Sequence, residues 1–397
     1  MRKRYFRALP PGTIVHGRYR IEEVLGAGGF GVTYQVTDLQ ENQIAAMKEY
    51  MPKDIAVRDP RSTNVVAKPD KEALYIRFRD KFLEEAQVMY RFRMHPGIVA
   101  VQHCFYENNT AYYTMEYLQG PNLMRFLENR GGTLCWEELM PIMAQLVALL
   151  REIHQEGIVH RDISPDNIIC LDDGEVKLID FGAARSTIRT NSSVLLLKRG
   201  FSPPEQLSLQ SKPGPWTDIY ALAVNIYFAY TGQMPPDSSD RIRKDRIRWP
   251  SELGMKIPSK QWEDSLKKAM SLRIQDRYHD VETFWMELTG APLQTPESFT
   301  LVGMRGYYEG TSVALCETFY LGRNPQKCQF LFPEGTPGVS YEHLQVWSDR
   351  SNAYVMDMGS TYGTWLGTQR LEPGKIYRMQ KGDRLSLGSS YQMFYLM

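Results

Sequence analysis

The sequence predicts an α+β domain, with strands in its first part and mostly helices in its second, followed by an all-β sandwich. Three observations predict this arrangement. Runs with strand patterning fill the beginning of the chain, amphipathic helical patterns fill the middle, and short β-rich runs separated by Gly, Pro and Asn return after Leu301. At 397 residues the chain is also too long for one ordinary core.

The composition carries no strong charge. Lys and Arg number 47 and Asp and Glu 46, so we expect no general attraction to nucleic acid or to an anionic membrane. The five cysteines are scattered and lack CxxC spacing, which predicts free thiols in a reducing cytoplasm. Neither a signal peptide nor a membrane span is predicted, because Pro-Pro-Gly follows the basic start and the longest apolar run, 219–230, is shorter than about 20 residues.

Two short motifs carry the chemistry of the larger domain. HRDISPDN occupies His160 to Asn167, and DFG begins at Asp180, a short strand later. An aspartate, an asparagine and a second aspartate at this spacing are the equipment of phosphoryl transfer. Both motifs together resemble the catalytic loop and magnesium motif of eukaryotic-type protein Ser/Thr kinases, including a bacterial subfamily that also has HRDISPDN.

The resemblance implies a role for each of these polar groups. Asp162 would accept the proton of the substrate hydroxyl, while Asn167 and Asp180 would hold Mg²⁺, with Mn²⁺ as an alternative, beside ATP. A buried aspartate could instead be a structural cap. Ser164 departs from the family, which usually has a lysine there, and the loss of that cation should weaken transition-state stabilisation unless another group replaces it.

Three strands are expected in residues 21–48, with a glycine-rich turn between the first two. A lone GxGxxG can be merely a flexible hairpin, but here a valine follows the last glycine and Ala-Met-Lys lies one strand later. The resemblance implies that this loop closes over ATP and that Lys48 holds the α and β phosphates. The residues that it assigns to ATP are Leu25, Gly26, Gly28, Gly31, Val32, Ala46, Lys48, Met115, Glu116, Leu118 and Ile169.

The periodicity of apolar residues predicts a helix over residues 78–92. The family supplies a glutamate from this helix as the partner of Lys48, and Glu85 fits better than the alternative, Glu84. Residues 48–73, between Lys48 and the helix, are longer than the family usually has and predict an ordered surface loop plus a strand. A role for this insertion does not follow from the sequence.

The resemblance also implies a bilobal fold, with an antiparallel sheet and one helix in the first lobe and a mostly helical second lobe. Strands over 98–107 and 110–118 should end in the hinge, with Met115 behind the adenine and the backbone of 116–118 bonding to it. Amphipathic patterning predicts a helix over 139–153. A central helix over 218–232 would place Asp218 to anchor the catalytic loop, and helices over 261–270 and 280–288 would close the lobe.

Residues 183–205 are the expected activation segment. Arg161 could hold a phosphate added there. Glu205, in the motif that closes the segment, should pair with Arg277. Lys198 stands where the family usually has a threonine beside the substrate, so the sequence does not predict which substrate peptides are preferred. The candidate phosphosites are Thr187, Thr190, Ser192 and Ser193.

The β-rich residues 301–397 resemble a forkhead-associated (FHA) domain, a phosphothreonine-binding sandwich. The resemblance implies that Arg323 and Ser340 bind the phosphate, that Thr361 and Gly363 shape the adjoining loop, and that His343 braces the Ser340 loop. Two departures concern selectivity: Tyr362 replaces the asparagine that grips the peptide backbone, and Tyr341 replaces an arginine.

Taken together, the motifs predict a protein Ser/Thr kinase with an FHA module that binds phosphothreonine, including that of its own activation segment, which would favour self-association. The alternatives are a pseudokinase scaffold and a small-molecule kinase of the aminoglycoside-phosphotransferase type. The boundaries predicted are an N-terminal extension at 1–18, a kinase domain at 19–289, a linker at 290–300 and the FHA domain at 301–397. Expected partners are protein substrates and phosphothreonine proteins.

Overall fold

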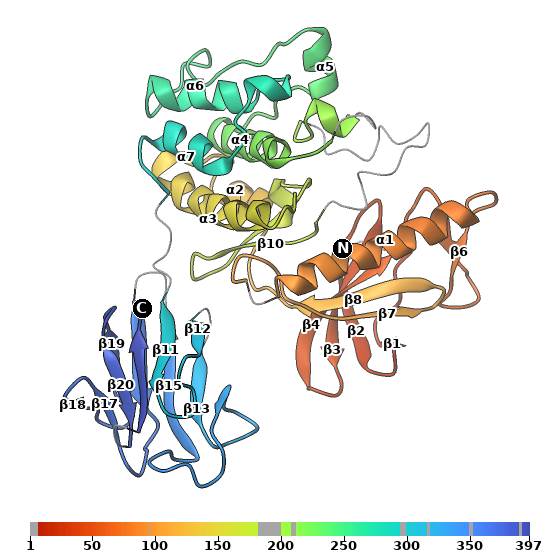
Figure 1. Ribbon diagram of the computed structural model, residues 1–397. Helices are drawn as coiled ribbons and strands as arrows, with labels where there is room; N and C mark the ends of the chain where they lie inside the picture. Colours follow the sequence, from red (N-terminus) through yellow and green to blue (C-terminus); the bar gives the residue numbers. More distant parts are fainter. Residues whose placement is uncertain are drawn as a thin grey trace. The chain divides into compact units, whose positions relative to one another are not determined.

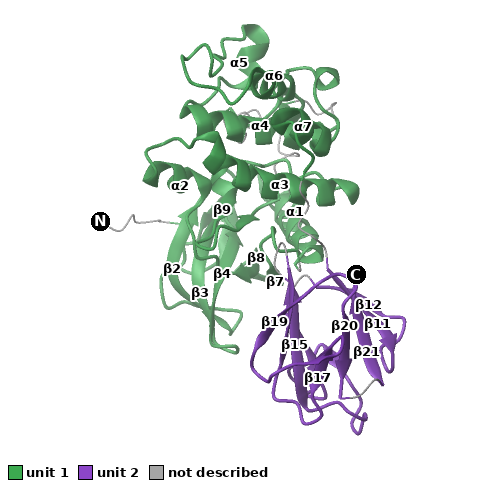
Figure 2. Cartoon of the chain, turned by 90° about the vertical axis from the view of Figure 1, so that its left-hand side faces the viewer, with its two compact units in different colours: residues 1–293 green, residues 294–397 purple. Residues whose placement is uncertain are grey.

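The computed structural model describes residues 7–93, 95–181, 200–207, 212–293, 299–315, 318–348, 352–388 and 391–397. The chain divides into two compact units, Met1–Leu293 and Gln294–Met397 (Figure 2). The predicted α+β domain and all-β sandwich are therefore both present. The finer domain boundaries remain predictions, because this division is coarser than they are.

The first lobe is a six-stranded antiparallel sheet with one long helix beside it. The helix, α1, contacts β7 and β8, and it lies along the sheet in Figure 1. Phe78, Phe82, Ala86 and Met89 are buried on it, as the helical periodicity predicted, but the helix begins six residues earlier than expected and also buries Tyr75. The strand order is β1-β2-β3-β4-β8-β7, and the bounds are β1 (Ile14–Val15), β2 (Tyr19–Ala27), β3 (Gly31–Asp38), β4 (Gln43–Tyr50), α1 (Glu72–Arg91), β7 (Val101–Glu107) and β8 (Thr110–Glu116).

The insertion between Lys48 and α1 is ordered and contains two strands, one more than predicted. β5 (Ala56–Arg58) and β6 (Val65–Ala67) pair as a small antiparallel hairpin. Ala56 and Val65 are fully buried and belong to the core of the larger unit, so the insertion packs onto the lobe. The sequence showed a single apolar stretch, and its second strand is recognisable only from this pairing.

The second lobe is mostly helical. Its longest helix, α3, buries Leu139, Ile142, Met143, Leu146, Leu150 and Ile153, as the predicted apolar stripe requires. Helix α4 is almost entirely buried, which confirms the reading of residues 219–230 as a core helix. The bounds are α2 (Leu123–Asn129), α3 (Trp136–Gln155), α4 (Pro215–Thr231), α5 (Ser238–Arg243), α6 (Lys260–Ala269) and α7 (Val281–Thr289), with a small hairpin of β9 (Ile168–Cys170) and β10 (Val176–Leu178).

The second unit is a sandwich of two sheets. One has the order β12-β11-β21-β20-β17-β18 and the other β14-β13-β15-β16-β19. Alternate residues of the strands are buried between the sheets, among them Leu321, Leu344, Val346, Leu385 and Phe394. The bounds are β11 (Thr300–Arg305), β12 (Ser312–Ala314), β13 (Phe319–Gly322), β14 (Phe330–Leu331), β15 (Glu342–Ser348), β16 (Ala353–Asp357), β17 (Thr364–Leu366), β18 (Gln369–Arg370), β19 (Ile376–Met379), β20 (Arg384–Leu387) and β21 (Gln392–Leu396).

Two expectations about the whole chain can be compared with the described residues. Within them, no helix has the length and apolar character needed to cross a bilayer. Four cysteines, Cys104, Cys135, Cys170 and Cys328, carry free thiols, as predicted. The fifth, Cys316, lies outside the described residues.

Candidate active site and phosphopeptide site

The backbone of the catalytic loop is hydrogen-bonded to a residue in the first turn of α4. The buried carboxylate of Asp218 accepts the backbone N–H of His160 and of Arg161, each at 2.8 Å, and lies 2.9 Å from Nε2 of His154. Arg161 adopts a positive φ of 67° at this point, a conformation that a non-glycine residue needs support to hold. The predicted anchoring role of Asp218 is confirmed.

Within this loop, the side chain of Asn167 is hydrogen-bonded to Asp162. The amide of Asn167 donates to Oδ2 of Asp162 at 2.6 Å and to its backbone oxygen at 2.9 Å. The backbone oxygen of Asn167 in turn accepts the N–H of Ile179 at 2.9 Å, which brings the residue before Asp180 against the loop. The three residues predicted from HRDISPDN and DFG therefore converge.

Lys48 enters the same site from β4. Its ammonium lies 2.5 Å from Oδ1 of Asp180, and the hydroxyl of Tyr113 donates to that oxygen at 3.1 Å. Burial raises the pKa of Tyr113, and the negative charges of Asp180 and Glu85 raise it further. The Tyr113 contact was missed from the sequence, where it read as an ordinary core residue of a strand.

Glu85 is buried on α1. The structure pairs Lys48 with Asp180, and the pair of Lys48 with Glu85 stays a prediction. The charge of Glu85 nevertheless acts on Tyr113, which touches Asp180. The assignment of Glu85 over Glu84 thus stays a prediction.

The side chains present fit a divalent metal with phosphate ligands. No group of three or more His, Cys, Asp or Glu in the described ranges could hold an ion alone. Magnesium is commonly held by one or two carboxylates together with substrate phosphates. Asn167 and Asp180 offer an amide oxygen and a carboxylate, which are oxygen ligands of that kind, since the amide nitrogen of Asn167 is already directed at Asp162.

The residues predicted to line the ATP site lie mainly on strands of the two lobes. Ala46 and Met115 face each other in register on β4 and β8 and are both nearly buried. Glu116 is fixed through its side chain, which accepts from Lys177 at 2.6 Å and from the N–H of Ala100 at 2.8 Å. The sequence did not single out Lys177. The remaining predicted residues lie on β2, the turn after it, β3, β9 and the segment after β8: Leu25, Gly26, Gly28, Gly31, Val32, Leu118 and Ile169.

The end of the activation segment is tied to the helical lobe. Glu205 accepts two hydrogen bonds from Arg277, at 2.7 and 3.1 Å, and both side chains are almost fully buried. This ion pair confirms the prediction made for these two residues. The candidate phosphosites Thr187, Thr190, Ser192 and Ser193, together with Lys198, lie outside the described residues.

The sandwich brings the predicted phosphopeptide residues into one loop cluster. The hydroxyl oxygen of Ser340 accepts the N–H of Thr361 at 2.9 Å, which leaves its proton available for a phosphate. Arg323, directly after β13, donates through Nε to the backbone oxygen of Val339 at 2.9 Å, so its stem is fixed beside Ser340. Gly363 has a φ of 82°, a left-handed conformation.

His343 connects the loop that contains Ser340 with the loop that contains Gly363. Its Nδ1 accepts the N–H of Ser340 at 3.0 Å, and its Nε2 lies 3.1 Å from the backbone oxygen of Gly363. The ring is fully buried, and this burial lowers the pKa of His343. The predicted bracing role is confirmed. Tyr341 and Tyr362, the two departures from the family pattern, are exposed beside the cluster.

Comparisons with known proteins agree with this geometry. The family model described as protein kinase domain matches residues 19–279, and the model of the FHA domain matches residues 319–388. The solved structure titled "PpkA-294 apo form" is 31% identical, with a TM-score of 0.63, and the match covers 71% of this chain and 99% of that one.

Two bacterial relatives carry kinase names. The chain is 30% identical over 283 residues to serine/threonine-protein kinase D of Synechocystis sp., covering 68% of this chain and 52% of the relative. It is also 30% identical over 283 residues to serine/threonine-protein kinase PrkC of Bacillus subtilis, covering 68% of this chain and 40% of PrkC. The chain thus spans about half or less of the length of these relatives. Since a family model matches well over half of its residues, the chain belongs to the protein kinase family, whose members use ATP and a divalent metal ion, and it carries an FHA domain.

Proposed function

We propose that this chain transfers the γ-phosphate of ATP to serine and threonine hydroxyls of protein substrates. The observation that carries the proposal is that Lys48 pairs with Asp180 while Asn167 bonds to Asp162, and that a backbone hydrogen bond from Ile179 to Asn167 links the two pairs. This is the set of groups that phosphoryl transfer requires for positioning and charge stabilisation. Pseudokinases generally lose residues of the Lys48, Asp162 or Asp180 type, and this chain keeps all three.

The proposed mechanism gives each of these side chains one task. Asp162, oriented by the amide of Asn167, would accept the proton of the attacking hydroxyl. Lys48 would neutralise charge on the α and β phosphates, and Asn167 and Asp180 would hold Mg²⁺. A bound Mg²⁺ ion supplies the charge that balances the phosphate oxygens. Ser164 leaves the catalytic loop without the lysine that the family usually has, so we expect a modest rate.

The FHA domain would bind phosphothreonine through Arg323 and Ser340. A guanidinium beside a hydroxyl whose oxygen already accepts a backbone N–H provides two donors for a phosphate. Thr361 and Gly363 would hold the neighbouring loop in shape. The ligand we propose is phosphothreonine at Thr187 or Thr190, within one chain or between two, which would couple autophosphorylation to self-association. The free thiols of the described cysteines support a role in the cytoplasm.

Incubation with labelled ATP and Mg²⁺, beside Asp162→Ala, tests the transferase. We expect label on Thr187, Thr190, Ser192 or Ser193 in the wild-type chain and none in the variant. Absence of label in both samples, together with absence of MgATP binding, would favour the scaffold.

A phosphopeptide that spans Thr187 and Thr190 tests the second module. Arg323→Ala should weaken binding to the full chain at least about tenfold, because a charge-assisted bond to phosphate is lost. Arg305→Ala, an exposed arginine on β11, is the matched control and should bind like the wild type. Equal affinity of the Arg323 variant and the wild type would contradict the proposed phosphate site.

A further inference from the structure

A segment before the first strand packs against β2 and β3, the two strands that the glycine-rich loop connects. We call residues 7–13 the N-terminal strap. Leu9 is buried and its N–H donates to the hydroxyl of Tyr34 on β3 at 3.0 Å. Further along, the N–H of Gly12 donates to the oxygen of Ile21 at 2.8 Å, and Ile21 donates back to Thr13 at 2.9 Å. The strap is therefore held by contacts with β2 and β3.

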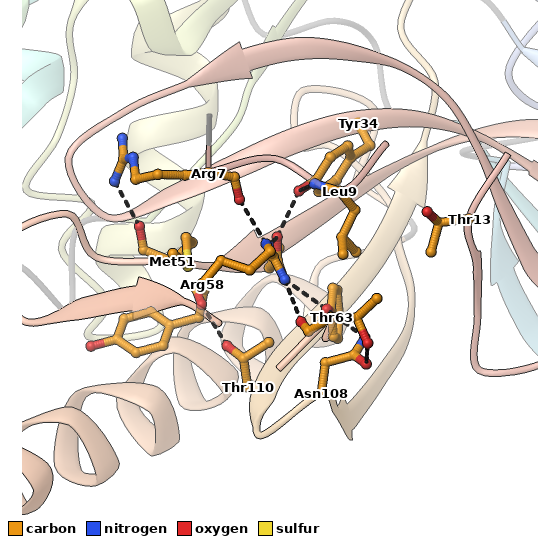
Figure 3. A network of polar contacts seen from close by, with 12 residues as sticks. Arg7, Leu9, Thr13, Tyr34, Met51, Arg58, Thr63, Asn108 and Thr110 are labelled. Atoms are coloured by element: carbon orange, nitrogen blue, oxygen red, sulfur yellow. Dashed lines mark hydrogen bonds and ion pairs between the residues drawn. The ribbon is translucent and has the colours of Figure 1, made fainter. Parts of the chain in front are cut away.

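The side chain of Arg7 connects the strap to the glycine-rich loop. One guanidinium nitrogen, Nη2, donates to the backbone oxygen of Gly28 at 3.1 Å. The other, Nη1, donates to the backbone oxygen of Met51 at 3.1 Å, a contact that Figure 3 shows. One side chain thus joins the loop to the first residues of the insertion.

The next two carbonyl groups of the loop are held by the insertion itself. The N–H of Lys53 donates to the oxygen of Gly29 at 3.0 Å, and the N–H of Met51 donates to the oxygen of Phe30 at 2.9 Å. Three consecutive carbonyl groups, at Gly28, Gly29 and Phe30, therefore accept donors from the strap or the insertion. A glycine-rich segment loses the most conformational freedom when it is ordered, and these bonds restrict it in advance.

A buried polar network holds the strap in place. Glu49, fully buried and next to Lys48, accepts from the hydroxyls of Tyr34 and Tyr112 at 2.6 and 2.7 Å and from Nη2 of Arg58 at 2.5 Å. Nε of Arg58 donates to the backbone oxygen of Arg7 at 2.8 Å (Figure 3). Because a buried, fully bonded charge pair is rigid, Arg7 is presented from a fixed base.

We propose that Arg7 is a positioning residue for nucleotide, which holds the glycine-rich loop closed over the phosphates of ATP, and that the insertion is the second half of the same clamp. This inference rests on the proposed function of the loop. Restricting the loop before ATP arrives reduces the entropy lost on binding, so the effect falls on nucleotide affinity. The guanidinium of Arg7 donates to the backbone of Gly28 and Met51, and Lys48 pairs with Asp180.

The test compares Arg7→Ala, Arg7→Lys and a control, Arg20→Ala, in the full chain. Arg20 lies on β2 and forms an exposed ion pair with Glu22 at 2.9 Å. Calorimetric titration with MgATP should give a dissociation constant about three- to tenfold higher for Arg7→Ala, with KM for ATP raised alike and kcat within about twofold. Arg7→Lys should be intermediate, because an ammonium can still donate to one of the two carbonyl groups, and Arg20→Ala should match the wild type.

Hydrogen exchange of residues 26–31 without nucleotide is the second measurement. We expect faster exchange in Arg7→Ala than in the wild type and Arg20→Ala, with an unchanged melting temperature. Wild-type MgATP affinity and wild-type loop exchange in Arg7→Ala would overturn the inference, as would a fall in kcat alone. If the wild type itself binds no MgATP, the proposed function fails, and the exchange measurement still decides whether Arg7 restrains the loop.

Discussion

The ammonium of Lys48 on β4 lies 2.5 Å from Oδ1 of Asp180, which follows β10 in the other lobe. The two lobes of the kinase domain are thereby joined at the site itself. Both side chains are mostly buried, so the pair is partly shielded from water and stronger than a surface ion pair. Binding of Mg²⁺ and phosphates would give both groups new partners, the metal for Asp180 and the phosphates for Lys48.

Replacement of Lys48 by methionine should lower phosphoryl transfer at least about 100-fold, because a preorganised positive charge is removed from the site. We also expect a lower melting temperature, because the mostly buried carboxylate of Asp180 loses its cation, so the rates are compared well below the melting temperature of both proteins. Steady-state kinetics with a protein substrate measures the effect. Lys260→Met, at the exposed start of α6, is the control and should keep the wild-type rate. A rate within tenfold of wild type for Lys48→Met would contradict the assigned role.

Replacement of Asn167 by alanine should raise the Mg²⁺ concentration needed for half-maximal rate about ten- to hundredfold, because a proposed metal ligand and the hydrogen bond that orients Asp162 are both lost. Titration of activity with Mg²⁺ at saturating ATP measures this shift. Asn225→Ala is a useful comparison, since Asn225 also bonds the catalytic-loop backbone, at Ile163, but offers no ligand to the metal site. An unchanged Mg²⁺ requirement in Asn167→Ala would exclude Asn167 as a ligand.

Replacement of Arg277 by methionine should reduce the free energy of unfolding by about 3–5 kcal/mol, because the carboxylate of Glu205 would stay buried without its partner. Denaturant unfolding followed by circular dichroism measures the loss. Arg130→Met is the matched control: Arg130 pairs with Glu138 at the surface, where the loss should stay below about 1 kcal/mol. Similar losses in both variants would show that the buried Glu205 pair stabilises the fold no more than the surface pair does.

The sandwich should lose stability as the pH falls below about 6.5, the usual pKa of histidine. Burial lowers the pKa of His343 in the folded chain, so the unfolded chain binds more protons at mildly acidic pH and is favoured by them. The stabilisation is complete above the unfolded pKa and disappears as the pH falls towards the folded pKa. Calorimetry of the full chain at pH 7.5 and 5.5 should show a larger downward shift of the corresponding transition in the wild type than in His343→Gln.

Much of the chain could be predicted because its decisive signals are local. The helical stripe of α3, the buried run of α4 and the order of HRDISPDN and DFG are each readable within a short window, since periodicity and motif spacing lie along the sequence. The pairs of Asp218 with the catalytic loop and of Glu205 with Arg277 followed from the family resemblance and are present.

The family, the two units and the identity of the polar groups at the site could thus be predicted from the residues alone. The packing of the folded chain determines that Asp180 engages Lys48, because one residue lies on β4 and the other after β10, far apart in the sequence. It also decided that Arg7 and the insertion hold the glycine-rich loop. Those contacts are single hydrogen bonds to backbone carbonyl groups far apart in sequence, and such bonds leave no pattern in the residues that accept them.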